Sequence, residues 1–309
     1  MSRPHVFFVV PTGPGSGLTT VSLGLVRALD RKGLRVAFYK PVRQPGRDEG
    51  REASSLFVAE TSDIEPIESF AWSYAEDLVA SGSDAQLLEE LVGRAQERLE
   101  RDEIDVLIVE GLIATADHPE LDTLNERIAT AFDAEVLLVG ALQRGTPEQL
   151  SERIELVGQH FGGIERGRML GAIVNKLNAP IEEVAGAART LRTEPEEHHD
   201  ADSLRESMPV FSDAFRLLGA IPWDPALVSP RTLDVARELE ARVLNEGELA
   251  HRRVDDVSVV ARTVANMTHR LRPGALIITP GDRDDVILAT AMATLNGVPL
   301  AGLVLTGGL

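Results

Sequence analysis

A glycine-rich segment near the amino end constrains the fold of this chain more than any other feature. Residues 11–20, PTGPGSGLTT, directly follow the apolar run 6–10 and precede the helical pattern VSLGLVRALDRKG. A buried strand, a glycine-rich turn and a helix in that order are typical of a phosphate-binding loop, in which backbone amides at the helix amino terminus surround an anion. The segment therefore predicts an α/β fold whose first strand lies inside a sheet.

The loop departs from the usual pattern at its charged position. Such loops end in Gly-Lys-Ser/Thr, because the lysine neutralises phosphate charge and the hydroxyl binds magnesium. Here the triplet is Gly17-Leu18-Thr19. The missing ammonium group argues against phosphoryl transfer and indicates a nucleotide-enzyme scaffold that is kept for another purpose.

Composition narrows the classes of partner. The 31 Lys and Arg against 49 Asp and Glu give a net charge of −18, which repels nucleic acid and acidic membrane surfaces. The chain has no cysteine, so disulfides, thiolate metal sites and a cysteine nucleophile are excluded. The apolar stretch at the amino end is too short for a signal peptide. We expect a cytoplasmic protein with neither a nucleic-acid nor a membrane partner.

Apolar runs and helical patterns alternate along the first two thirds of the chain. Runs that read as strands buried on both faces occur at 34–40, 105–110, 135–140, 169–175 and 215–221. Helical patterns lie between them, and the polar segment 193–207, which contains His198-His199-Asp200, reads as a solvated loop rather than a metal site. This alternation predicts a doubly wound, mostly parallel sheet.

The pattern restarts after Asp224. A helix is expected over 232–245, strands over 254–260, 274–280 and 300–306, and further helices near 262–270 and 284–296. We therefore predict two domains, residues 1–224 and a smaller α/β domain over 225–309. Because the chain stops directly after a strand and a Gly-Gly turn, we expect the second domain to be incomplete.

Ligand contacts in open α/β sheets come from the carboxyl ends of the strands. Lys40 and Arg43 follow the second strand, where they are either anion contacts or ordinary surface cations. Glu110 ends the third strand, where it either meets a magnesium ion beside Thr19 or caps a helix. Asn175, followed by Lys176, is placed to read the edge of a purine ring. The complete candidate effector site is Thr12, Gly13, Gly15, Gly17, Thr19, Thr20, Lys40, Arg43, Glu110 and Asn175.

The second domain has two turns that follow strand ends. One contains Asp282 and Arg283, and the other contains Thr306, Gly307 and Gly308. They either form a pocket or an interface, or they reflect turn chemistry alone with the aspartate capping the next helix. The chain contains no nucleophile elbow, HExxH motif or dinucleotide fingerprint, so we expect no catalytic residues of its own.

An ordered set of motifs closely resembles the N-terminal region of the long form of bacterial phosphate acetyltransferase. In order along the chain, these motifs are PTGPGSGLTT, FYKPVRQP, VEGL, TPEQLSERIEL, VNKLNAP, LLGAIPW, GDRDD and LTGG. In that family the first unit is similar to dethiobiotin synthetase, and the second is the DRTGG domain. The dethiobiotin synthetase pattern is matched by Gly17, Thr19, Lys40 and Glu110. Leu18 and Gly13 depart from it, which weakens the case for ATP hydrolysis.

The resemblance implies a parent enzyme that exchanges acetyl between coenzyme A and phosphate in a C-terminal domain absent from this chain. It also implies an N-terminal region concerned with regulation by metabolites and with homo-oligomer assembly. Three hypotheses follow: a non-catalytic effector site for ATP with magnesium or for NADH, an ATP-dependent ligase like dethiobiotin synthetase, and an assembly domain that binds no ligand.

Overall fold

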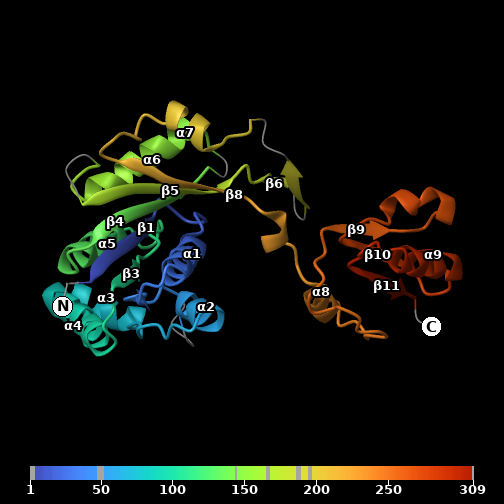
Figure 1. Cartoon of the computed structure of the whole chain (residues 1–309), viewed down its shortest axis with the longest axis horizontal. Coiled ribbons are helices and arrows are strands. Elements are labelled where there is room, and N and C mark those ends of the chain that lie inside the picture. Colours follow the sequence, from blue (N-terminus) through green and yellow to red (C-terminus); the bar gives the residue numbers. More distant parts are fainter. Residues whose placement is uncertain are drawn as a thin grey trace. The chain divides into compact units, whose positions relative to one another are not determined.

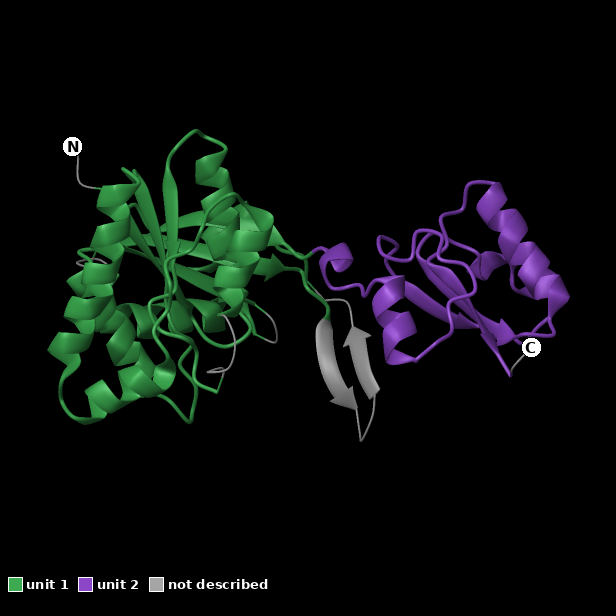
Figure 2. Ribbon diagram, turned by 90° about the horizontal axis from the view of Figure 1, so that it is seen from below, with its two compact units in different colours: residues 1–223 green, residues 224–309 purple. Residues whose placement is uncertain are grey.

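The chain divides into two compact units, residues 1–223 and 224–309 (Figure 2). The computed structural model describes residues 4–46, 52–142, 145–164, 168–185, 189–193 and 197–307, with only the backbone of 181–185 and 189–193. Gly308 lies outside the described residues.

The first unit is built on a six-stranded sheet in the order β2-β3-β1-β4-β5-β8, and every neighbouring pair is parallel. The predicted doubly wound, mostly parallel sheet is thereby confirmed. The strands are β1 (His5–Pro11), β2 (Val36–Tyr39), β3 (Val106–Glu110), β4 (Glu135–Ala141), β5 (Met169–Leu177) and β8 (Arg216–Pro222).

Helices cover both faces of this sheet (Figure 1). Along β1, Phe8 and Val10 enter one buried cluster and Val9 enters the other, because successive side chains of a strand point to opposite faces. The cluster around Val9 includes residues of α1 and α2, whereas the cluster around Phe8 includes residues of the other helices. These helices are α1 (Leu18–Asp30), α2 (Ala53–Thr61), α3 (Trp72–Ala80), α4 (Asp84–Arg101), α5 (Glu120–Ala131), α6 (Pro147–His160) and α7 (Ala201–Ser207).

The segment 193–207 is not a solvated loop throughout, so that prediction was wrong. Residues 189–193 form strand β7 (Arg189–Thr193), which pairs antiparallel with β6 (Ile181–Ala185), and residues 201–207 form α7. Asp200 and Ser203 make a reciprocal capping box at the start of α7, and Leu204 is fully buried. One well-placed leucine and a good cap therefore outweigh the polar composition. No group of three His, Cys, Asp or Glu side chains gathers around a metal position within the described ranges.

The second unit contains a three-stranded parallel sheet in the order β11-β10-β9. Its elements are η1 (Pro225–Leu227), α8 (Thr232–Glu238), β9 (Asp256–Val259), η2 (Val264–Asn266), η3 (Thr268–Arg270), β10 (Ala275–Pro280), α9 (Asp284–Leu295) and β11 (Gly302–Thr306). The helix expected over 232–245 ends at Glu238, and the one expected near 262–270 is two 3₁₀ turns. Beyond Glu238 the apolar side chains Leu239, Val243 and Leu244 are exposed, so no packing supports further helical turns.

No helix in the described part of the chain combines the length and the apolar character that a membrane span requires.

Candidate ligand site at the glycine loop

The loop between β1 and α1 has the backbone of an anion-binding turn. Gly15 and Gly17 adopt φ of 79° and 81°, conformations that favour glycine, and Gly17 is the N-cap of α1. The free amides of the first helical turn therefore open onto the loop. The Ser16 hydroxyl is buried, and none of the described residues gives it a hydrogen-bond partner. A buried donor of this kind is suited to an anion that enters the loop.

Leu18 stands where the usual loop lysine would stand, and its side chain is only 3 % exposed. It belongs to the apolar cluster between the sheet and α1, together with Val9, Val21 and Phe38. The position that normally carries the loop charge is thus part of the core.

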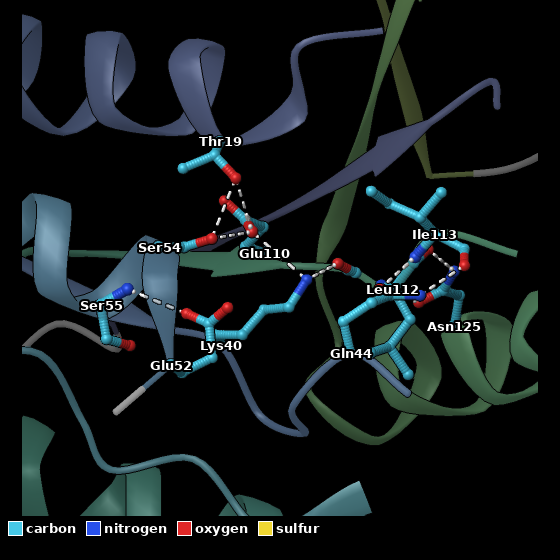
Figure 3. A network of polar contacts seen from close by, with 11 residues as sticks. Thr19, Lys40, Gln44, Glu52, Ser54, Ser55, Glu110, Leu112, Ile113 and Asn125 are labelled. Carbon is cyan, nitrogen blue, oxygen red and sulfur yellow. Dashed lines mark hydrogen bonds and ion pairs between the residues drawn. The ribbon is translucent and has the colours of Figure 1, made fainter. Parts of the chain in front are cut away.

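A buried polar network lies beside the loop (Figure 3). Lys40 and Glu110 are 2 % and 1 % exposed, and Lys40 Nζ lies 3.2 Å from Glu110 Oε1. The same ammonium donates to the carbonyl of Gly111. Ser54 Oγ donates to Glu110 Oε1 at 2.7 Å, and Thr19 Oγ1 lies 2.9 Å from Ser54 Oγ and 3.4 Å from Glu110 Oε1. The structure thus brings together Thr19, Lys40 and Glu110, as the sequence predicted, but Lys40 neutralises an internal carboxylate.

The segment after Glu110 is held by two side-chain amides (Figure 3). Asn125 exchanges hydrogen bonds of 2.8 and 2.9 Å with the backbone of Leu112, and Gln44 exchanges bonds of 2.7 and 2.9 Å with that of Ile113. Both amides satisfy backbone groups at a strand end. They are positioning residues that the sequence analysis missed, as is Ser54, because polar residues of these types are common and carry no distinctive spacing.

Magnesium is the metal that this loop type implies, and the oxygen donors present fit it. Hydroxyl and carboxylate oxygens are the ligands that magnesium prefers. Glu110 Oε2 is buried and has no hydrogen-bond partner among the described residues. Thr19 Oγ1 and Glu110 Oε2 are therefore the atoms that would hold the ion.

Strand β5 contacts the loop through two consecutive side chains. Asn175 Nδ2 donates to the carbonyl of Ser16 at 3.0 Å, and Lys176 Nζ donates to that of Gly15 at 2.8 Å. The contact is close, because a Cβ on Gly17 would lie 2.2 Å from Asn175 Nδ2. The amide expected to read a purine edge thus donates to the loop itself.

The remaining candidate residues of the first unit are Thr12, Gly13, Thr20 and Arg43. Thr12 donates its backbone N–H to the carbonyl of Val139 at 2.8 Å, and Gly13 has a φ of 149°. Thr20 is exposed on the first turn of α1. Arg43 donates its backbone N–H to the carbonyl of Phe70 at 2.9 Å.

The two turns of the second unit meet at one sheet edge. Pro280 and Thr306 are register partners in parallel strands, and Gly281 N donates to Thr306 O at 2.9 Å. Arg283 is the N-cap residue of α9, and its guanidinium bonds the Asp285 carboxylate at 2.8 and 2.9 Å. Asp282 and Gly307 flank these contacts in the same turns. The guanidinium of Arg283 is thus paired with a carboxylate two residues away in the same helix turn.

A cavity of about 470 Å³ lies at the opposite, amino edge of the first unit's sheet. Its walls include Val6, Arg35, Leu99 and Phe132. Since the loop lies at the carboxyl edge, this cavity is a separate feature from the candidate site.

A parallel sheet with a glycine loop before its first helix, and with an acid at the end of the neighbouring strand, defines a P-loop type of α/β protein with an altered loop. Residues 5–231 match the model of a family described as AAA domain, and residues 234–309 match the DRTGG domain. The chain therefore belongs to the AAA domain family, and a DRTGG domain follows in the sequence.

Curated relatives extend the comparison. The chain is 44 % identical over 303 residues to a phosphate acetyltransferase of Pseudomonas aeruginosa, covering 97 % of this chain and 42 % of the relative. It is 38 % identical over 323 residues to that of Escherichia coli, covering 100 % of this chain and 43 % of the relative. The chain thus spans about two fifths of the length of these curated relatives, and the predicted family resemblance is confirmed.

Among solved structures, the chain is similar to the signal recognition particle receptor FtsY from Elizabethkingia anophelis. The identity is 19 %, the TM-score is 0.41, and the match covers 57 % of this chain and 51 % of that one.

Proposed function

We propose that the loop between β1 and α1 binds a small anionic metabolite or nucleotide and that it acts as a regulatory site without catalysis. One observation carries the proposal: Leu18 is packed in the core at the position of the loop charge, while the loop keeps its left-handed glycines and leads into the start of α1. The first amides of a helix have no partner within the helix. Such a loop retains the groups that bind an anion. It lacks the mobile lysine that stabilises charge during phosphoryl transfer.

The whole protein, in this proposal, exchanges acetyl between coenzyme A and phosphate, as the names of the relatives suggest. The present chain supplies a regulatory and assembling region to that enzyme. Occupation of the loop can alter activity elsewhere only if the ligand binds two conformations with different affinity. Oligomer formation through this region and a cytoplasmic location belong to the same proposal.

Calorimetric titration of the chain with ATP, NADH, pyruvate and acetyl-CoA, each with and without magnesium, tests the loop site. We expect at least one of these ligands to bind. It should bind more weakly when Ser16 is replaced by alanine, because that change removes the buried hydroxyl donor. Absence of binding across the panel would favour a region that only assembles subunits.

One specific observation favours the ligase hypothesis. Thr19, Ser54 and Glu110 are joined by hydrogen bonds, and the second carboxylate oxygen of Glu110 has no partner among the described residues. This is the donor arrangement that would hold magnesium. Release of ADP from ATP and magnesium by the unaltered chain would support the ligase. A Leu18→Lys variant that gains this turnover would show that only the loop charge is missing.

A further inference from the structure

We propose that Lys176 supplies the positive charge that Leu18 cannot, so that the loop binds a phosphate-bearing anion through a lysine from β5. This inference rests on the proposed function, since it assigns the cation and the ligand class of the same loop site.

The ammonium of Lys176 reaches the loop directly. Lys176 Nζ donates to Gly15 O at 2.8 Å, and its Cε lies 3.6 Å from where a Cβ on Gly17 would stand. An ammonium has three donors, and within the described residues one of them is used. No carboxylate in the described part of the chain forms an ion pair with Lys176. Its charge therefore remains available to an anion.

The backbone at Lys176 takes an unusual conformation that allows this contact. Successive side chains of a strand point to opposite faces, yet Asn175 and Lys176 both bond the loop. Lys176 has a φ of 54°, in the left-handed region that is unfavourable for a side chain of this type, and the pairing of β5 with β8 shifts register between Val174 and Leu177. Strained positions of this kind cluster at binding sites.

Lysine usage gives an independent observation. The chain has 31 basic residues, but only three of them, Lys32, Lys40 and Lys176, are lysines. Two of these three lie at the loop site, one bound to Glu110 and the other to the loop carbonyl. Lysine binds phosphate as a compact point charge.

The polar groups that line the glycine loop indicate the class of ligand. The first amides of α1, the unpartnered Ser16 hydroxyl and the Lys176 ammonium are all donors. Donors alone suit a phosphate ester or diphosphate. Because a cation from the protein is already present, we expect such a ligand to bind in the absence of magnesium.

The test uses the full 309-residue chain titrated with ATP and with inorganic pyrophosphate in EDTA. Lys176→Gln keeps a donor for the Gly15 carbonyl but removes the charge, and Lys176→Arg keeps the charge. Lys32→Gln, an exposed position just beyond the far end of α1, is the matched control. We expect about a ten- to hundredfold weaker affinity for Lys176→Gln and no change for Lys32→Gln. We expect Lys176→Arg to retain most of the affinity. Circular dichroism checks that all variants are folded.

A second readout follows lysine acetylation by acetic anhydride, measured by mass spectrometry. Saturating ATP should slow the labelling of Lys176 and leave that of Lys32 unchanged. If ATP binds the original chain and Lys176→Gln equally well, the assignment of Lys176 is overturned while the loop site stands. If neither ATP nor pyrophosphate binds the original chain at millimolar concentration, the loop site and the assignment both fail.

Discussion

Removing Lys40 should destabilise the first unit far more than removing a surface cation. Both partners of the Lys40–Glu110 pair are at least 98 % buried, and Lys40→Met leaves the Glu110 carboxylate without a counter-ion. Breaking a buried ion pair by removing one partner costs about 3–5 kcal/mol. We expect Lys40→Met to lie in that range, because hydrogen bonds from Ser54 and Thr19 replace only part of the lost interaction.

A double-mutant cycle isolates the pair itself. Glu110→Gln removes the charge but keeps an acceptor, so we expect its cost near the lower end of the same range. In Lys40→Met/Glu110→Gln no charge remains buried, and the double variant should be more stable than the sum of the single changes predicts, by about 2–3 kcal/mol. Arg205→Met is the matched control, since it removes one cation from the exposed pair with Asp202 and should have no measurable effect.

The assay is urea unfolding followed by tryptophan fluorescence. The only two tryptophans, Trp72 and Trp223, both belong to the first unit, so the signal reports that unit even when the second unfolds separately. Strictly additive costs, or a Lys40→Met variant no less stable than the Arg205→Met control, would refute the conclusion that Lys40 neutralises Glu110 in the interior.

Three further perturbations probe separate features. Gly17→Ala places a Cβ 2.2 Å from the β5 asparagine amide, at a backbone φ of 81°. We therefore expect about 1–3 kcal/mol of destabilisation, and loss of ATP binding measured by calorimetry. The control Gly24→Ala, in open space on α1, should be neutral or stabilising. Tyr39→Phe should raise the free energy of unfolding by about 1 kcal/mol, because it removes a buried hydroxyl that has no hydrogen-bond partner among the described residues. The same burial raises the pKa of this hydroxyl. Hydrogen bonds from Arg35 lower the pKa of Asp105 to about 2, so its contribution to stability is complete above about pH 4 and is lost as the pH falls toward 2. Urea midpoints of Asp105→Asn should therefore lie below those of the original chain at pH 7 and converge with them near pH 2.

Several site residues could be placed from sequence because each follows an apolar run. Lys40 and Glu110 end β2 and β3, and parallel strands bring such ends to one edge of the sheet. Ser54 could not be found in this way, since it lies in α2 and follows no strand. The ion pair was missed for a related reason: sequence places both groups at one edge but does not say whether the charges face each other or a ligand.

The local framework is predictable from the order of the amino acids: the glycine loop, the strands of the parallel sheet and the helices with strong apolar periodicity. These follow from backbone sterics and from side-chain alternation, which act within a few residues. Tertiary structure alone decided that Leu18 enters the core, that Lys40 neutralises Glu110, and that Lys176 reaches a carbonyl 161 positions away in the chain. Sheet order and packing bring those groups together, and neither is encoded in the spacing of neighbouring residues.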